Sequence, residues 1–367
     1  TYKKDKAVDK NTIYDVASVT KILATTLGVM RLYETGKLSL DKTIGDYLPW
    51  TRQSNKADLK IRDLLMHQAG LKSWIPFYRE TMDAKGNLRP DLYSSKPDNN
   101  NWIQVASGLY LRGDYVDSIW SEILASPLEN KGRYVYSDLD FYFLAAIVEK
   151  ISGQHLDQYV DQQFYKPLGL KYITYLPLKK FNQSQIAPSE NDLFFRHQQL
   201  IGYVHDQGAA LFGGVAGHAG IFSTANDVAV IFQMLLNKGT YGGKRYFKKE
   251  TVELFTRYNS TISRRGLAFD KPIPDADDAG PTGNRCSGYT FGHQGFTGTC
   301  VWADPATGIL FVFLSNRLQP SSDNNMINKM SVRTVSQDYM YESLGFPINH
   351  ERPALYKKEL AENLANK

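Results

Sequence analysis

Two residues one helical turn apart form the most informative pattern in this chain. Ser18 and Lys21 make a Ser-x-x-Lys pair at the start of a run that is apolar on nearly every side. A serine hydroxyl is a poor nucleophile at neutral pH and needs a base within hydrogen-bond reach. Residues three apart share a helix face, so Lys21 can serve if burial or neighbouring cations lower the pKa of its amine. The helix N-terminus adds N–H groups for a developing oxyanion.

The pair alone is not specific. Ser39 and Lys42 repeat the spacing in a polar segment after Gly36, where a turn and an exposed lysine are expected. For Ser18 and Lys21, an N-capping serine followed by a lysine with its charge in water would give the same pattern. Lys21 differs because it begins a buried stretch, where a charge costs free energy unless it serves a purpose.

The elements that position this pair are mostly helices. Residues 16–34 predict one helix that is apolar all round and ends before Gly36. Further helices are expected over residues 61–69, 141–152, 156–164 and 228–236. Thr224 and Asp227 precede the last of these and resemble a capping box, with the Thr hydroxyl and an acidic side chain three residues later.

Strands dominate near the C-terminus. Residues 289–295, 299–304 and 309–315 alternate or run apolar between turns, which predicts a three-stranded antiparallel meander, and a helix over residues 325–344 follows. The pattern favours an α+β fold, an antiparallel sheet flanked by helices with an inserted helical lobe. The site is expected in the crevice between the lobes.

We expect a single catalytic unit over residues 1–367. Its α/β lobe takes residues 1–60 and 285–345, its helical lobe residues 61–284, and a C-terminal tail residues 346–367. Residues 76–116 lose all periodicity, so they predict a long surface excursion, either a lid or an insertion.

Composition excludes several function classes. The net charge of +5 comes from scattered lysines, so no nucleic-acid site is expected. Cys286 and Cys300 are expected as free thiols, and no Cys and His spacing resembles a zinc site, so neither a metal nor a cofactor is predicted. The longest apolar run, residues 309–314, is far shorter than the ~18 residues of a membrane span, and no signal peptide opens the chain.

The order of four motifs resembles the serine β-lactamase and penicillin-binding-protein superfamily, in the branch of class C β-lactamases, D-Ala-D-Ala carboxypeptidases and esterases. Those motifs are Asp15-Val16-Ala17-Ser18-Val19-Thr20-Lys21, Ile61-Arg62-Asp63-Leu64-Leu65-Met66-His67-Gln68-Ala69-Gly70-Leu71, Tyr136-Ser137-Asp138, and Gly292-His293-Gln294-Gly295-Phe296-Thr297-Gly298-Thr299. The resemblance covers essentially the whole chain.

The resemblance implies roles for these residues. Ser18 attacks a carbonyl and Lys21 takes its proton, while Tyr136 relays a proton to the leaving group, its phenol kept acidic by the ammonium. The N–H groups of Ser18 and Phe296 form the oxyanion hole. The implied substrate-binding residues are Asp138, His293, Gly295 and Arg317.

The chain departs from the family pattern in two of these residues. Asp138 stands where an Asn is usual, and a carboxylate can only accept hydrogen bonds, which puts β-lactam and peptide recognition in doubt. His293 replaces the Lys of Lys-Thr-Gly, and we expect its imidazolium to help hold a substrate carboxylate. His205 and Asp206 could line the cleft, but a turn-stabilising pair is the better interpretation.

The family usually has two strands before the segment that matches residues 2–14, so the chain is expected to be a fragment. Residues 213–224 resemble relatives fused behind a glycoside hydrolase of the bacterial cell envelope, which favours a periplasmic, envelope or secreted location. The preferred function is hydrolysis, through an acyl-enzyme on Ser18, of a D-alanyl peptide or a small ester or amide. The alternatives are a non-catalytic peptidoglycan-binding or accessory module and a true β-lactamase.

Overall fold

The computed structural model describes residues 7–129, 131–275 and 278–365. Its α-helices are α1 (Thr26–Glu34), α2 (Ile44–Tyr47), α3 (Ile61–Leu65), α4 (Tyr115–Ala125), α5 (Leu139–Ser152), α6 (Leu156–Val160), α7 (Gln207–Leu211), α8 (Ala225–Leu236), α9 (Lys249–Thr256), α10 (Met326–Lys329), α11 (Val332–Ser343) and α12 (Arg352–Ala365). Its strands are β1 (Tyr14–Asp15), β2 (Tyr93–Ser94), β3 (Asn101–Ala106), β4 (Leu109–Arg112), β5 (Asn191–Asp192), β6 (Gln198–Gln199), β7 (Phe222–Ser223), β8 (Thr240–Tyr241), β9 (Lys244–Arg245), β10 (Phe291–Gln294), β11 (Cys300–Asp304) and β12 (Ile309–Phe313). Short 3-10 or π segments are η1 (Ala17–Val19), η2 (Lys21–Thr25), η3 (Pro49–Thr51), η4 (Phe77–Thr81), η5 (Asp161–Tyr165), η6 (Pro177–Lys179) and η7 (Gln183–Gln185).

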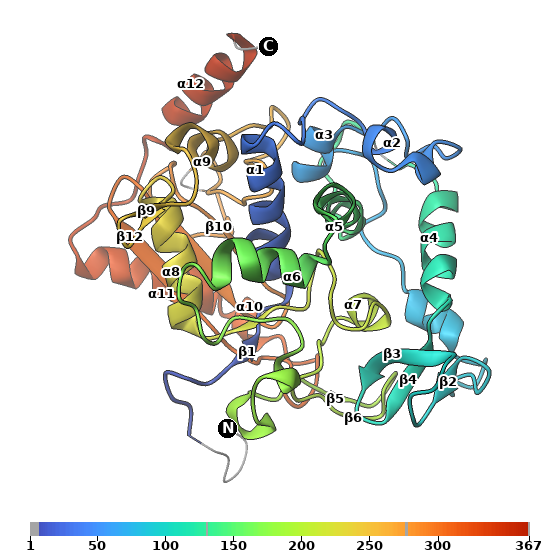
Figure 1. The fold of residues 1–367 in the computed structure, drawn as a ribbon. Coiled ribbons are helices and arrows are strands. Elements are labelled where there is room, and N and C mark those ends of the chain that lie inside the picture. The colour runs from blue at the N-terminus through green and yellow to red at the C-terminus, as the bar shows by residue number, and fades with distance from the viewer. Residues whose placement is uncertain (1–6, 130, 276–277, 366–367) are drawn as a thin grey trace.

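The C-terminal strands form the predicted meander. The order is β10-β11-β12, with both pairs antiparallel. Helix α8 packs against β11 and β12, and the Tyr341 hydroxyl of α11 donates to Asp304 at the end of β11 (3.0 Å). In Figure 1 these elements lie on one side and α4, α7 and β2 to β4 on the other, with α1 and α5 between them. The α+β prediction is confirmed.

The predicted helix over residues 16–34 is helical, but its hydrogen bonding changes along its length. It starts as the 3-10 turn η1, continues as the π segment η2 and becomes α-helical only in α1. Gly36, at φ +70°, follows its end as predicted. Such irregular segments are common at functional sites, and here they carry Ser18 and Lys21.

Residues 76–116 contain more structure than their sequence indicates. They hold η4 and a three-stranded antiparallel sheet in the order β2-β4-β3. The pairing of β3 with β4 is irregular between Asn101 and Ile103 and again between Gln104 and Ala106. These irregularities interrupt the two-residue alternation by which a strand is recognised in a sequence. Residues 352–365 of the expected tail form α12, whose buried Arg352 donates to the carbonyl oxygens of Gly283 and Cys286.

The capping box before α8 forms only in part. The Thr224 hydroxyl accepts from the Asp227 N–H (3.4 Å), as predicted. The Asp227 carboxylate instead accepts from the N–H groups of residues 171–173, at 2.6 to 3.1 Å. The Asp227 side chain therefore connects α8 to residues 171–173 and does not cap the N-terminus of its own helix.

Candidate active site

Ser18 lies in a strained turn that a buried carboxylate supports. Ala17 has φ 47°, in the left-handed region that non-glycine residues rarely adopt. Its N–H donates to Asp15 Oδ1 (2.8 Å), and the His205 N–H donates to Asp15 Oδ2 (2.7 Å). Strain of this kind persists where the surroundings hold it in place and concentrates at functional sites. Asp15 was not predicted as a site residue, although it stands in the first motif.

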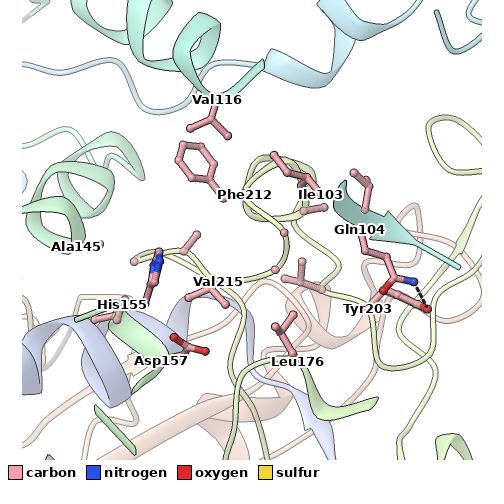
Figure 2. A pocket seen from close by; sticks show the side chains of 18 of the residues that line it. Ile103, Gln104, Val116, Ala145, His155, Asp157, Leu176, Tyr203, Phe212 and Val215 are labelled. Atoms are coloured by element: carbon pink, nitrogen blue, oxygen red, sulfur yellow. Dashed lines mark hydrogen bonds between the residues drawn. The ribbon is translucent and has the colours of Figure 1, made fainter. Parts of the chain in front are cut away.

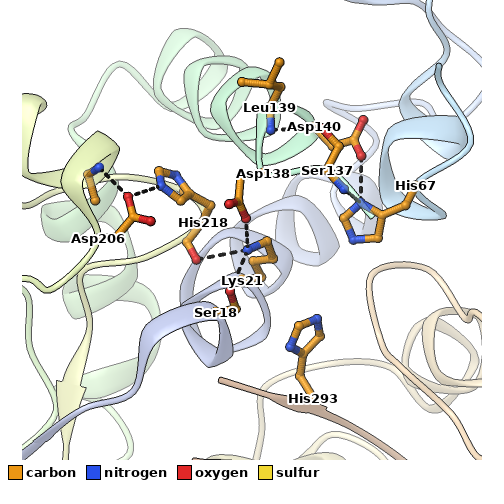
Figure 3. A network of polar contacts seen from close by, with 12 residues as sticks. Ser18, Lys21, His67, Ser137, Asp138, Leu139, Asp140, Asp206, His218 and His293 are labelled. Atoms are coloured by element: carbon orange, nitrogen blue, oxygen red, sulfur yellow. Dashed lines mark hydrogen bonds and ion pairs between the residues drawn. The ribbon is translucent and has the colours of Figure 1, made fainter. Parts of the chain in front are cut away.

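The structure brings Lys21 onto Ser18, as the sequence predicts. The side chain of Lys21 is fully buried. Its Nζ donates to Ser18 Oγ (3.1 Å), to Asp138 Oδ1 (2.6 Å) and to the His218 carbonyl oxygen (3.2 Å), as Figure 3 shows.

The charge state of Lys21 differs from the sequence-based expectation. Burial acts to lower its pKa, but the Asp138 carboxylate, followed by Tyr136, outweighs burial and raises the pKa above its ordinary value. An opposite charge at hydrogen-bond distance stabilises the ammonium. The condition that the sequence sets for Lys21 to act as a base, a lowered pKa, is therefore not met, and the ammonium form of Lys21 is favoured.

Tyr136 lies beside the same amine. The centre of the Tyr136 ring lies 5.0 Å from Lys21 Nζ and 5.5 Å from the Arg265 guanidinium. Burial raises the pKa of Tyr136, and the opposing effect of Lys21 does not reverse this. The phenol is therefore protonated at neutral pH, which contradicts the expectation that the ammonium keeps it acidic.

A buried histidine and carboxyl group hold the backbone next to Tyr136. His67 Nδ1 lies 2.7 Å from Asp140 Oδ2 and accepts from the Ser137 N–H (3.2 Å). Burial lowers the pKa of His67 well below its ordinary value and raises that of Asp140 well above it. Both shifts favour the uncharged forms, a neutral imidazole on His67 and a protonated carboxyl group on Asp140. Asp140 was missed, although a carboxyl group in the first turn of a largely apolar helix is a recognisable signal.

His293 is at the site but does not carry the predicted charge. Its Nδ1 is 2.6 Å from the Gln294 carbonyl oxygen, and its buried Nε2 makes no hydrogen bond with the described residues. Burial, then Arg265 and Lys21, lowers the pKa of His293 to about 3. The imidazole is neutral at physiological pH, so the predicted anchoring of a carboxylate by an imidazolium is wrong. A neutral Nε2 can still accept a hydrogen bond from a substrate.

The end of β10 approaches the Ser18 turn closely. A Cβ at Gly295 would lie 2.5 Å from the Val16 carbonyl oxygen, so only glycine fits there. Phe296 follows with a side chain that is 56% exposed, and its N–H makes no hydrogen bond within the described part of the chain. The Arg317 guanidinium lies 4.5 Å from the Phe296 ring and donates from Nε to the Phe296 carbonyl oxygen (2.7 Å). The Phe296 N–H, a candidate donor to the oxyanion, and Arg317 thus lie side by side on the rim of the site.

His205 and Asp206 each contact other residues rather than each other. His205 Nε2 contacts Glu190 Oε2 (2.6 Å). Asp206 accepts from the Ala209 N–H (2.7 Å) at the start of α7 and contacts His218 Nε2 (2.8 Å) (Figure 3). Through His218, whose carbonyl oxygen contacts Lys21, Asp206 belongs to the network behind the catalytic candidates.

Neither a metal centre nor a membrane span emerges from residues 7–129, 131–275 and 278–365. No group of three or more His, Cys, Asp or Glu side chains in these ranges could hold a metal ion. None of the helices there combines the length and apolar character that crossing a bilayer requires. Cys286 and Cys300 are free and buried, as predicted.

Comparisons with known proteins agree with this geometry. The Beta-lactamase family model matches residues 2–330. A protein of Escherichia coli strain K12, provisionally named a D-alanyl-D-alanine carboxypeptidase, is 35% identical over 328 residues, 83% of this chain and 69% of that protein. A protein of Salmonella enteritidis PT4 with the same name is 33% identical over 338 residues, 87% and 72% of the two chains.

Solved structures share the fold. A penicillin-binding-protein homologue from Caulobacter crescentus has a TM-score of 0.61 at 20% identity, covering 86% of this chain and 80% of that one. EstCE1, a hydrolase with promiscuous acyltransferase activity, has a TM-score of 0.57 at 21% identity, covering 85% and 81%. With the two relatives above 30% identity and the family match over most of the chain, these findings establish that the protein belongs to the Beta-lactamase family and is a serine hydrolase.

Proposed function

We propose that the protein hydrolyses D-alanyl peptides through an acyl-enzyme on Ser18. The observation that carries the proposal is the contact of 3.1 Å between Ser18 Oγ and the buried Lys21 Nζ. Ser18 Oγ attacks the carbonyl carbon, and its proton passes to Lys21 in the neutral form. The C–N bond to the leaving D-amino acid breaks as its nitrogen takes a proton through Tyr136. Water then hydrolyses the ester and restores the serine hydroxyl.

The N–H groups of Ser18 and Phe296 are the proposed oxyanion hole. The free N–H of Phe296 supports this role, because a donor that points at developing negative charge must not be engaged elsewhere. Gly295 supports it indirectly, since the absent side chain lets β10 come close to the Ser18 turn.

Substrate recognition is proposed to depend on Arg317 and His293. A D-alanyl peptide ends in a carboxylate, and the neutral His293 supplies no charge to hold it. Arg317 uses Nε and Nη1 on the carbonyl oxygens of Phe296 and Asn324, and it lies on the rim next to the proposed oxyanion hole. A guanidinium in that place suits a carboxylate. The names of the two relatives favour the same substrate class.

Asp138 is proposed to set the pH range of the reaction. Its carboxylate holds Lys21 as an ammonium, and an ammonium cannot accept the Ser18 proton. Acylation therefore needs the fraction of molecules in which Lys21 has lost its proton. That fraction rises with pH, so we propose that kcat/KM increases toward alkaline pH.

The proposed setting is the bacterial cell envelope, where peptides with D-alanyl ends occur. The resemblance of residues 213–224 to domains fused behind a glycoside hydrolase extends the proposal to a chain that works beside a glycan-cleaving partner. The extension is tested by whether the gene that encodes this chain also encodes a glycoside hydrolase domain.

Intact mass spectrometry tests the nucleophile. The protein is incubated with a fluorophosphonate and, separately, with a penicillin, and is compared with Ser18→Ala. We expect a single adduct with each reagent that Ser18→Ala abolishes. A fluorophosphonate adduct without a penicillin adduct would favour an esterase over a D-alanyl peptidase. No adduct with either reagent on folded protein would reject Ser18 catalysis.

A further inference from the structure

A cavity lies next to the catalytic network but does not include it. It measures about 800 Å³ and is lined in part by the turn at residues 213–217. The following residue, His218, accepts a hydrogen bond from Lys21 through its carbonyl oxygen. Ser18, Lys21 and Tyr136 are absent from the lining. The volume is within the range of small-molecule sites, about 300 to 1,000 Å³.

The body of the cavity is apolar. Figure 2 shows Val116 and Phe212 on one side, with Val215, Leu176 and Ala145 completing the wall around the open space. These side chains come from α4, α5, the loop after α7 and the residue before η6, so the space lies between elements of the helical part of the fold. An apolar ligand body would replace water against them.

The polar groups at the cavity edge favour a positive charge. Asp157 Oδ1 accepts from the Gln158 N–H (2.8 Å), and its other carboxylate oxygen takes part in no hydrogen bond or ion pair with the described residues. Glu149, a second carboxylate in the lining, already accepts from the Leu156 N–H (2.9 Å) and lies 3.5 Å from His155 Nδ1. Lys179 is the only lysine or arginine among the described lining residues. In Figure 2, Asp157 and His155 face the cavity from the side opposite Gln104 and Tyr203. A carboxylate with a free oxygen attracts an ammonium and repels an anion.

Indole rings at the cavity add to this preference for a positive charge. Trp50 is 47% exposed and packs edge-on against Trp120, with ring centres 5.0 Å apart. Trp102 is 62% exposed, and its ring occupies the space where a Cβ of Gly113 would lie, 2.0 Å from Nε1. All three indoles line the cavity. Aromatic faces attract cations, so these indoles favour a cationic ligand over an anionic one.

We propose that this cavity is a binding site for small amines with an apolar, alkyl or aryl body and an ammonium head, the head lying near Asp157. The site is distinct from the Ser18 centre, so it does not depend on the proposed peptidase activity.

Three isosteric probes test the proposal: 4-phenylbutylamine, 4-phenylbutanol and 4-phenylbutyrate, titrated at neutral pH and followed by calorimetry and by tryptophan fluorescence. We expect the amine to bind about tenfold more tightly than the carboxylate, with the alcohol between them. The reason is that Asp157 attracts the ammonium of the amine and repels the charge of the carboxylate. Ser18→Ala should bind the amine like the native protein. Equal or tighter binding of the carboxylate, or no binding of any probe at millimolar concentration, would overturn the proposal.

Two variants locate the site. Asp157→Asn should weaken the amine about fivefold and leave the alcohol unchanged, as expected for a partly exposed ion pair. Asp161→Asn is the matched control, since Asp161 lies one helical turn further on and pairs with Lys166 outside the cavity. Val215→Trp should fill the space and abolish binding of all three probes, with circular dichroism to establish folding. Unchanged amine affinity in either Asp157→Asn or Val215→Trp would contradict the assigned location.

Discussion

At the scale of single residues, the chemistry of this site depends on what surrounds Lys21. Its amine is completely buried and is shared by a hydroxyl, a carboxylate and a carbonyl oxygen. A buried ammonium without such partners would be very costly, so the three contacts explain why the charge is tolerated. The contact with the Asp138 carboxylate stabilises the ammonium form, so Lys21 can act as a base only in the molecules in which it has lost a proton.

Replacement of Asp138 tests that balance. In Asp138→Asn the opposite charge next to Lys21 disappears, so the pKa of Lys21 falls. Since neutral Lys21 is the proposed base, the ascending limb of the kcat/KM profile should move to lower pH by about one to three units. Activity at neutral pH should rise accordingly. Profiles measured with a neutral nitrophenyl ester check this, and an unmoved limb, or one moved to higher pH, would contradict it.

Arg317 is predicted to act on substrate binding alone. Arg317→Ala removes a charge-assisted contact of about 1.5 to 3 kcal/mol, so KM for a substrate with a terminal carboxylate should rise about ten- to a hundredfold. A neutral ester of the same acyl group is the control and should keep its KM. Steady-state kinetics with both substrates distinguish this role from a structural one, in which the two substrates would lose activity equally.

At the scale of elements, Asp227 connects two parts of the chain that are distant in sequence. The carboxylate is buried and receives the N–H groups of residues 171–173. Helix α8, which it opens, packs against the sheet whose first strand carries His293. The orientation of the sheet relative to the helices therefore depends partly on this one side chain.

Asp227→Ala should lower the free energy of unfolding by about 1 to 3 kcal/mol, because it leaves buried N–H donors without an acceptor. Urea denaturation followed by circular dichroism measures the change. Asn226→Ala, one residue earlier on the exposed side of the same turn, should shift the midpoint far less. Equal shifts in the two variants would show that the loop connection contributes nothing.

At the scale of the whole molecule, buried histidine makes the protein sensitive to acid. His293 has a folded-state pKa of about 3 against an ordinary value of 6.5. Between these values the unfolded chain binds a proton that the folded chain does not, so stability falls as the pH is lowered from about 6.5 toward 3. His67 is shifted in the same direction.

His293→Gln removes one of these groups. From pH 7 to pH 4.5, the native protein should lose about 2.5 kcal/mol more stability than the variant, at roughly 1.4 kcal/mol for each pH unit below 6.5. Urea midpoints at both pH values measure the difference. The same loss in both proteins would mean that His293 is able to take up its proton in the folded state.

Several properties of this protein follow from the sequence by itself. Ser18 and Lys21 share a face because they are one helical turn apart, and the helices and the C-terminal meander follow from local periodicity. These features depend on neighbours in the chain, so they could be predicted. The irregular strands at residues 93–112 could not, because irregular pairing disrupts the alternation.

Only the tertiary structure decided the charges at the site. The pKa values of Lys21, His67, Asp140 and His293 depend on burial and on partners far away in the sequence, such as Asp138, which lies 117 residues from Lys21. The pairing of Asp206 with His218 and the cavity beside them likewise arise only when separate segments pack together. Electrostatic energies depend on distance in space and on exclusion of water, and neither is encoded by spacing along the chain.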